Sequence, residues 1–219
     1  FLRCGASMVL LFDPEATVPY AGISPSRVHC SEHVALSRRV ARESIVMLKN
    51  NGALPLSSEL KDLVVAGPNA HEDAPLIANY HGYAPGMLTV YDGILARTSP
   101  GCPVKHLQGC HLHKDIPIAA NEINSLIDGE TNAVIAVLGN TNELEGEEGE
   151  VALSDGGGDR TTISLPGRQL ELLRALRAKI DEGGEGRTAL ILVVLSGSPV
   201  DLEEAEPLVD AILYAWYPG

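Results

Sequence analysis

The chain has 219 residues, enough for one sizeable hydrophobic core, and 45% of them are hydrophobic. Its net charge of −13 would be repelled by nucleic acid and by anionic membrane surfaces, so we expect neither as a partner. The sequence contains no apolar run near the ~20 residues that a membrane-spanning helix needs. These totals indicate an acidic globular protein.

The first 30 residues lack helical periodicity and contain three prolines, which predicts an extended connector over residues 1–30. Ser31 suits the N-cap of a helix over residues 32–49, whose apolar side chains form one stripe. We expect residues 31–219 to form an incomplete domain. Both ends of the chain are expected to continue into a longer protein.

From residue 63 onward, short aliphatic runs alternate with amphipathic segments. The expected strands are residues 63–66, 104–107, 133–138, 189–195 and 209–215. Helices are expected over residues 74–80, 90–97, 116–127 and 201–205, and in the segment that Leu165 opens. Continuous apolar strands separated by amphipathic helices are typical of a mostly parallel sheet covered by helices on both faces. The sequence therefore predicts the α/β class.

A long, acidic and glycine-rich loop follows the third expected strand and spans residues 139–164. Its carboxylates are Glu143, Glu145, Glu147, Glu148, Glu150, Asp155 and Asp159. Ligands of open α/β sheets bind beyond the carboxyl ends of the strands, so chemistry is expected here. A carboxylic acid among other carboxylates has a raised pKa and keeps its proton nearer to neutral pH, as a general acid requires.

Other chemistries fit this loop less well. The chain has neither the G-x-G-x-x-G fingerprint of dinucleotide-binding folds nor a P-loop lysine motif. The EF-hand pattern is also absent, although an isolated calcium site needs no motif. A solvated acidic surface loop is the simplest alternative. Against it, a structureless insertion of this length in a compact domain is usually functional or disordered.

The cysteines and histidines give no clear metal or redox motif. Cys102 and Cys110 are close in sequence but flank an expected strand, which favours free thiols over a disulfide. His111 and His113 stand beside Cys110, yet they are more simply explained as polar residues at the end of a strand than as metal ligands. We therefore expect no metal and no cofactor.

A series of short motifs resembles the second domain of glycoside hydrolase family 3, the group that contains β-glucosidases and β-xylosidases. The motifs follow the family's order over nearly the whole chain. They are residues 41–50, 54–56, 67–70, 79–82, 89–94, 137–139, 144–147, 158–160, 165–169, 195–197 and 215–219. Each is weak alone, whereas their number and order make the resemblance specific.

The resemblance implies a flavodoxin-like α/β sandwich, here truncated at its C-terminus, preceded by a barrel domain that this chain lacks. In that family the barrel supplies an aspartate nucleophile, and a loop of the second domain lends an acid/base glutamate. The implied activity is exo-acting, retaining hydrolysis of terminal β-linked glucose or xylose, from an oligosaccharide or aryl glycoside, and the fragment alone is expected to be inactive. The resemblance also suggests a secreted or periplasmic protein. A non-catalytic carbohydrate-binding or interaction module is the alternative.

The resemblance places the acid/base residue in the acidic loop, shortly before an Asp-Arg pair. Glu145 is the first choice, Glu147 the second and Glu148 the third. The choice stays open because the spacer before Asp159-Arg160 is longer than in the family. Asp159 and Arg160 are expected to form a charge-assisted pair that braces the base of the loop.

Overall fold

The structure is a computed structural model, which describes residues 20–77, 79, 81–82, 85–145, 153, 160–184 and 188–219. The chain divides after Val40 into two compact units, residues 1–40 and 41–219. The first described elements are the 3-10 turn η2 (Pro25–Arg27) and the helix α2 (Ser31–Ser44), none of whose residues is buried.

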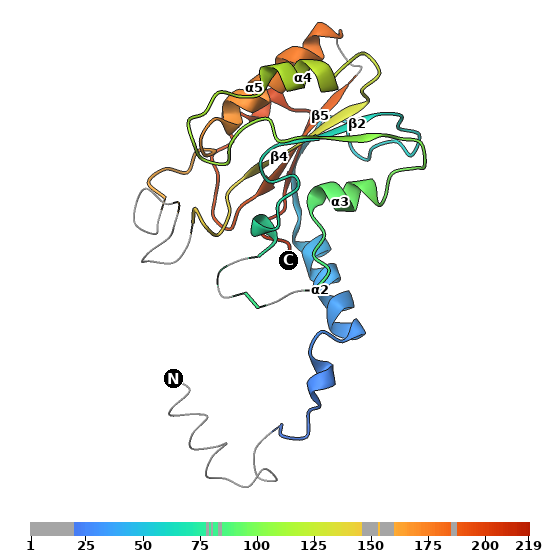
Figure 1. Cartoon of the computed structure of the whole chain (residues 1–219), viewed down its shortest axis with the longest axis vertical. Helices are drawn as coiled ribbons and strands as arrows, with labels where there is room; N and C mark the ends of the chain where they lie inside the picture. Colours follow the sequence, from blue (N-terminus) through green and yellow to red (C-terminus); the bar gives the residue numbers. More distant parts are fainter. Residues whose placement is uncertain are drawn as a thin grey trace. The chain divides into compact units, whose positions relative to one another are not determined.

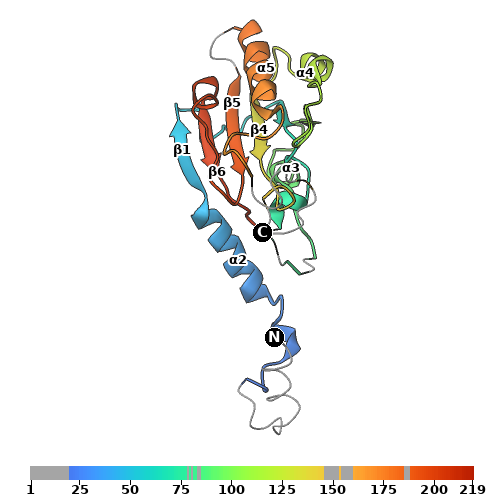
Figure 2. The same cartoon turned by 90° about the vertical axis from the view of Figure 1, so that its left-hand side faces the viewer.

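Within the described part of residues 41–219, six strands form one sheet in the order β1-β6-β5-β4-β2-β3. The strands are β1 (Val46–Asn50), β2 (Leu63–Ala66), β3 (Val104–Leu107), β4 (Ala133–Gly139), β5 (Ala189–Leu195) and β6 (Ala211–Tyr214). β1 runs antiparallel to β6 at the edge of the sheet, where Figure 2 shows it, and the other neighbouring pairs are parallel. The expected α/β class and the mostly parallel sheet are confirmed.

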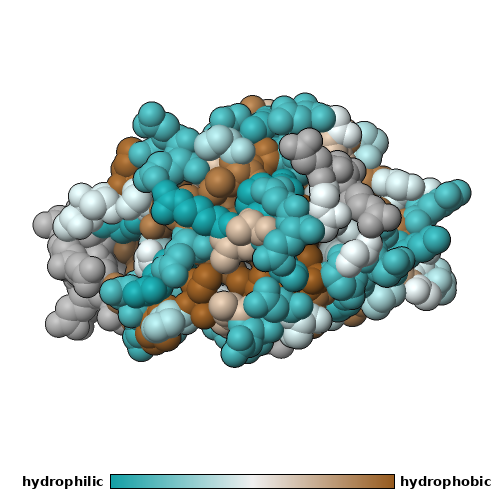
Figure 3. All heavy atoms as spheres, turned by 90° about the horizontal axis from the view of Figure 1, so that it is seen from above, coloured by the Kyte–Doolittle hydropathy of each residue, from teal (hydrophilic) through white to brown (hydrophobic). Residues whose placement is uncertain are grey.

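Helices cover both faces of this sheet. The remaining elements are η3 (Ala74–Leu76), α3 (Val90–Leu95), α4 (Ala120–Leu126), α5 (Gln169–Glu182) and η4 (Glu206–Leu208). α4 and α5 lie side by side in Figure 1 and bury Ile123, Leu172 and Leu176 against one face. α3 packs on the other face through Val90 and Ile94. Figure 3 shows hydrophilic residues over much of the surface seen from above, as expected for a net charge of −13.

The helix expected over residues 32–49 was too long. It ends at Ser44, whose backbone carbonyl accepts a hydrogen bond from Trp216 Nε1 at 3.0 Å. Val46–Asn50 instead forms strand β1, in register with β6 through the pair Val46 and Tyr214. The β-branched residues at 45 and 46 suit an extended backbone, and pairing with β6 gives its polar groups partners.

Three shorter helices also differ from expectation. Residues 74–80 contribute only the turn η3, after which Ile77 has extended dihedral angles. The helix expected at residue 116 begins at Ala120, because the N–H of Ala119 donates to the carbonyl of Gly109 at 2.8 Å instead. Residues 201–205 form turns, because Asp201 Oδ1 accepts the N–H of Glu203 and competes with helical pairing.

Some global features concern only the part of the chain that the structure describes. Its three cysteines, at 30, 102 and 110, are all free thiols, as favoured for the latter two. Its histidine, cysteine and acidic side chains form no group of three or more that is placed to hold a metal ion. No helix found there has the length and apolar character needed to cross a membrane.

Candidate active site

The acidic loop leaves β4 at Gly139, a position that only glycine tolerates. The residue has φ +125°, and a Cβ built on it would lie 2.0 Å from the carbonyl oxygen of Leu195. The fully buried Gln169 then pairs with it as a strand would. Its Oε1 accepts the N–H of Gly139 at 2.7 Å, and its Nε2 donates to the carbonyl of Gly139 at 2.9 Å. These contacts fix the direction in which the loop starts.

Glu145 is reached after one turn beyond β4. The backbone N–H groups of Leu144 and Glu145 both donate to the carbonyl of Thr141, at 3.0 and 3.2 Å. Leu144 is buried, which ties this turn to the protein interior. Glu145 therefore lies at the carboxyl edge of the sheet, where the sequence predicted chemistry.

The side chain of Glu145 accepts hydrogen bonds from the segment that follows β5. Its Oε1 accepts the N–H of Gly197 at 2.5 Å and the N–H of Ser198 at 3.3 Å. The hydroxyl of Ser198 donates to Oε2. A Cβ on Gly197 would lie 3.2 Å from Oε1 of Glu145 and 2.8 Å from the ring of Tyr217, so a glycine is needed for this close approach.

Two more segments reach the same carboxylate. Asn140, at the end of β4, donates from Nδ2 to Oε2 of Glu145 at 3.1 Å. The hydroxyl of Tyr217, after β6, donates to Oε1. Ser196 is also near, but its single hydroxyl hydrogen is closer to the carbonyl of Ser198, at 2.8 Å, than to Glu145, at 3.3 Å. The ends of β4, β5 and β6 thus meet at one side chain.

The phenols around Glu145 are held in their protonated, donating form. Burial raises the pKa of Tyr217, and its hydrogen bond to Glu145 raises this pKa further. Burial likewise raises the pKa of Tyr214, whose hydroxyl donates to the carbonyl of Ser198. The carboxylate of Glu145 therefore faces donors that keep their hydrogens over the whole physiological pH range.

Arg160 supplies the nearby positive charge. Burial lowers the pKa of its guanidinium, while the charge of Glu145 acts in the opposite direction. Its Nη2 donates to the carbonyl of Ser164, so it holds the far end of the acidic loop. Asp159 lies outside the described residues, and the expected Asp159–Arg160 brace stays a prediction.

The other candidates of the loop, Glu147 and Glu148, also lie outside the described residues. The contacts that anchor Glu145 were missed by sequence reasoning, although most of the residues stood within the family motifs. Gln169 closes the motif 165–169, Gly197 closes 195–197, and Tyr217 belongs to 215–219. A motif gives residue identities, whereas their common target is visible only in three dimensions.

His111 and His113 do not join this cluster. Their rings contact each other edge-to-face, with centroids 5.0 Å apart. His111 Nδ1 accepts the N–H groups of His113 and Lys114, at 3.4 and 3.3 Å, and burial lowers the pKa of His111. These contacts agree with the interpretation of polar residues that organise the end of a strand.

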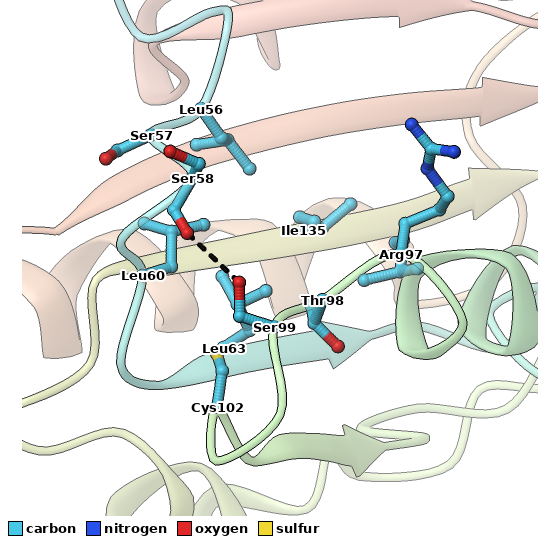
Figure 4. Close-up of a pocket in the computed structure, with 11 residues that line it drawn as sticks. Leu56, Ser57, Ser58, Leu60, Leu63, Arg97, Thr98, Ser99, Cys102 and Ile135 are labelled. Atoms are coloured by element: carbon cyan, nitrogen blue, oxygen red, sulfur yellow. Dashed lines mark hydrogen bonds between the residues drawn. The ribbon is translucent and has the colours of Figure 1, made fainter.

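A cavity of about 270 Å³ lies elsewhere on the sheet, at the start of β2. Figure 4 shows its mainly aliphatic walls, which include Leu60, Leu63 and Ile135, and the hydrogen bond from Ser99 Oγ to the carbonyl of Ser58 at 3.2 Å. Its lining, among residues the structure describes, contains no carboxylate. Acid/base chemistry therefore points to the Glu145 edge instead of this cavity.

Comparison with known proteins identifies similar domains. Residues 45–219 match the model described as the glycosyl hydrolase family 3 C-terminal domain. The chain is 32% identical over 196 residues to a beta-xylosidase of Formosa agariphila, covering 86% of this chain and 25% of that protein. It is also 32% identical over 213 residues to beta-D-xylosidase 3 of Arabidopsis thaliana, covering 94% and 24%. The chain thus spans about a quarter of the length of these relatives.

Solved structures show the same similarity. A GH3 exo-beta-xylosidase (XlnD), in complex with a xylobiose aziridine activity-based probe, has 28% identity and a TM-score of 0.77, covering 95% of this chain and 25% of the other. The beta-glucosidase from Listeria innocua in complex with glucose has 21% identity and a TM-score of 0.73, covering 92% and 25%. The second likeness concerns the fold alone.

Proposed function

This chain belongs to glycosyl hydrolase family 3, and we propose that its acidic loop supplies the acid/base glutamate of a retaining, exo-acting β-glycosidase. One observation carries the proposal: in a domain of this family, a loop rich in carboxylates leaves the carboxyl end of β4 and is tethered there at Glu145. Glu145, Glu147 and Glu148 are the candidates for the proton donor.

The proposed reaction divides the work between two domains. A nucleophilic aspartate, from a barrel domain outside this chain, attacks the anomeric carbon and displaces the leaving oxygen. The loop glutamate protonates that oxygen, then removes a proton from the water that releases the sugar. In retaining glycosidases the two carboxyl groups stand ~5–5.5 Å apart. The loop therefore has to place its acid over a pocket held by the other domain.

The proposed substrate is a terminal β-linked xylose, with β-linked glucose as the second choice. The Formosa and Arabidopsis relatives are named as β-xylosidases at 32% identity, and the more similar of the two structures is an exo-β-xylosidase. No cofactor is required by this proposal, because two carboxyl groups suffice for the reaction.

The test uses the intact protein that carries this chain, with aryl β-xylosides and aryl β-glucosides as substrates. We expect turnover, with faster hydrolysis of the xyloside. Proton NMR of the first product should show the β-anomer, which is the signature of retention. Release of the α-anomer would contradict the mechanism. Sugar binding without turnover would instead support the non-catalytic module.

A further inference from the structure

We infer that Glu145 is not the proton donor but the carboxylate that anchors the acid/base loop to the ends of β5 and β6. This inference rests on the proposed function and concerns which glutamate of the loop does which task. Glu145 is then a positioning residue, and the acid/base role falls to Glu147 or Glu148.

The hydrogen bonds of Glu145 leave little capacity for acid catalysis. Its oxygens accept from two backbone N–H groups, one amide and two hydroxyls, contributed by Gly197, Ser198, Asn140 and Tyr217. A carboxylate offers about four lone-pair sites, so these donors use them all. A backbone N–H or an amide N–H only donates, so a proton added to Glu145 would have to displace one of them.

A general acid has the opposite requirement. It must present one protonated oxygen to the leaving group, within about 2.6–3.2 Å of the atom that receives the proton. Oε1 of Glu145 is directed to Gly197 and Tyr217, and Oε2 is directed to Asn140 and Ser198. Both oxygens thus face the protein that surrounds them.

The anchor joins segments that are distant in the sequence. Gly197 is 52 residues from Glu145, and Tyr217 is 72 residues away. The missing side chain at Gly197 creates the space for this contact, because a Cβ there would meet Tyr217 at 2.8 Å. Such a contact fixes one point of the loop relative to the sheet edge.

Covalent geometry limits the positions open to the residues after the anchor. Two residues span at most about 7 Å, so the backbone at Glu147 stays within that distance of the backbone at Glu145. Fixing Glu145 therefore restricts where a proton donor two or three residues later can stand. A misplacement of about 1 Å at a reacting centre costs on the order of 10²-fold in rate.

The test measures kcat/KM of the intact protein for aryl β-xylosides with good and poor leaving groups. Glu145→Gln should lower kcat/KM for both classes by a similar factor, about 10²-fold, because the acid is displaced but present. Tyr217→Phe, which removes one donor and leaves the loop glutamates intact, should give a smaller loss of the same kind. Glu143→Gln is the matched control: it removes one negative charge from an exposed side chain of the same loop and should change neither class.

Added azide separates the two roles. Azide attacks the glycosyl-enzyme without needing a general base, so it rescues a variant that lacks the acid/base residue and yields a glycosyl azide. We expect rescue in Glu147→Ala or Glu148→Ala, and none in Glu145→Ala. Azide rescue of Glu145→Ala, together with a selective loss on poor leaving groups, would overturn the inference.

A second readout stands apart from catalysis. A glutamate-specific protease should cleave the native Glu145→Gln protein within residues 146–159 faster than it cleaves the Glu143→Gln protein, which lacks one cleavage site as well. Equal cleavage rates would contradict the anchor. Because this measurement needs no substrate, an absence of glycosidase activity would refute the proposed function while the anchor is still tested.

Discussion

Gln169→Leu gives the sharpest test of how the loop is directed. Leucine has a similar volume, but it removes the donor and the acceptor that pair with Gly139 and the donor to the carbonyl of Leu112 at 2.8 Å. Gly139 and residue 169 are buried, so water does not readily replace these partners. Each buried polar group left unpaired costs about 1–3 kcal/mol, and three such groups predict a loss of about 3–6 kcal/mol in the free energy of unfolding.

Urea denaturation of the intact protein measures this loss as a change in the free energy of unfolding of the domain. Gln108→Leu is the matched control, because Gln108 is exposed and its described contacts include no side-chain hydrogen bond. The control should stay within about 0.5 kcal/mol of the wild type. A loss below about 1 kcal/mol for Gln169→Leu would refute the view that this side chain replaces a strand partner.

Two other predictions concern backbone and thiol. Gly139→Ala should lower the free energy of unfolding by more than about 3 kcal/mol, since its Cβ would lie 2.0 Å from the Leu195 carbonyl, whereas Gly52→Ala, also at positive φ but in open space, should cost about 1 kcal/mol; equal losses in denaturant unfolding would contradict the steric reason. Burial raises the pKa of the Cys110 thiol from 9.0 to about 12. The folded state thus keeps a proton that the unfolded state releases, so stability should fall as pH rises from 9 toward 12. Cys110→Ala should reduce that slope in unfolding curves recorded across this range, and an unchanged slope would show that the thiol is not responsible.

The strands of the sheet could be predicted because their residues are continuously apolar. β2 and β3 match the expected residues, and β4 and β5 match within one residue at each end. β1 was missed because the apolar residues at 45 and 48 also fit the stripe of a helix. Only the pairing with β6 decides between the two, and that contact is tertiary.

The location of the candidate site was predictable, whereas its internal order was not. The acidic loop follows a strand, and general rules place chemistry at that edge. The partners of Glu145 come from segments 52 and 72 residues away, which no local pattern connects. The division of roles among the loop glutamates depends on those contacts, and spacing alone favours the first glutamate of the segment.

The rate of hydrolysis of an unactivated disaccharide tests the central claim most directly. The intact protein is compared with a variant in which Glu145, Glu147 and Glu148 are all replaced by glutamine. Loss of general acid catalysis and of the anchor predicts a fall of at least about 10²–10⁴-fold on this substrate, with a smaller fall on an activated aryl xyloside. An unchanged rate on the disaccharide would contradict the claim that this loop delivers the proton.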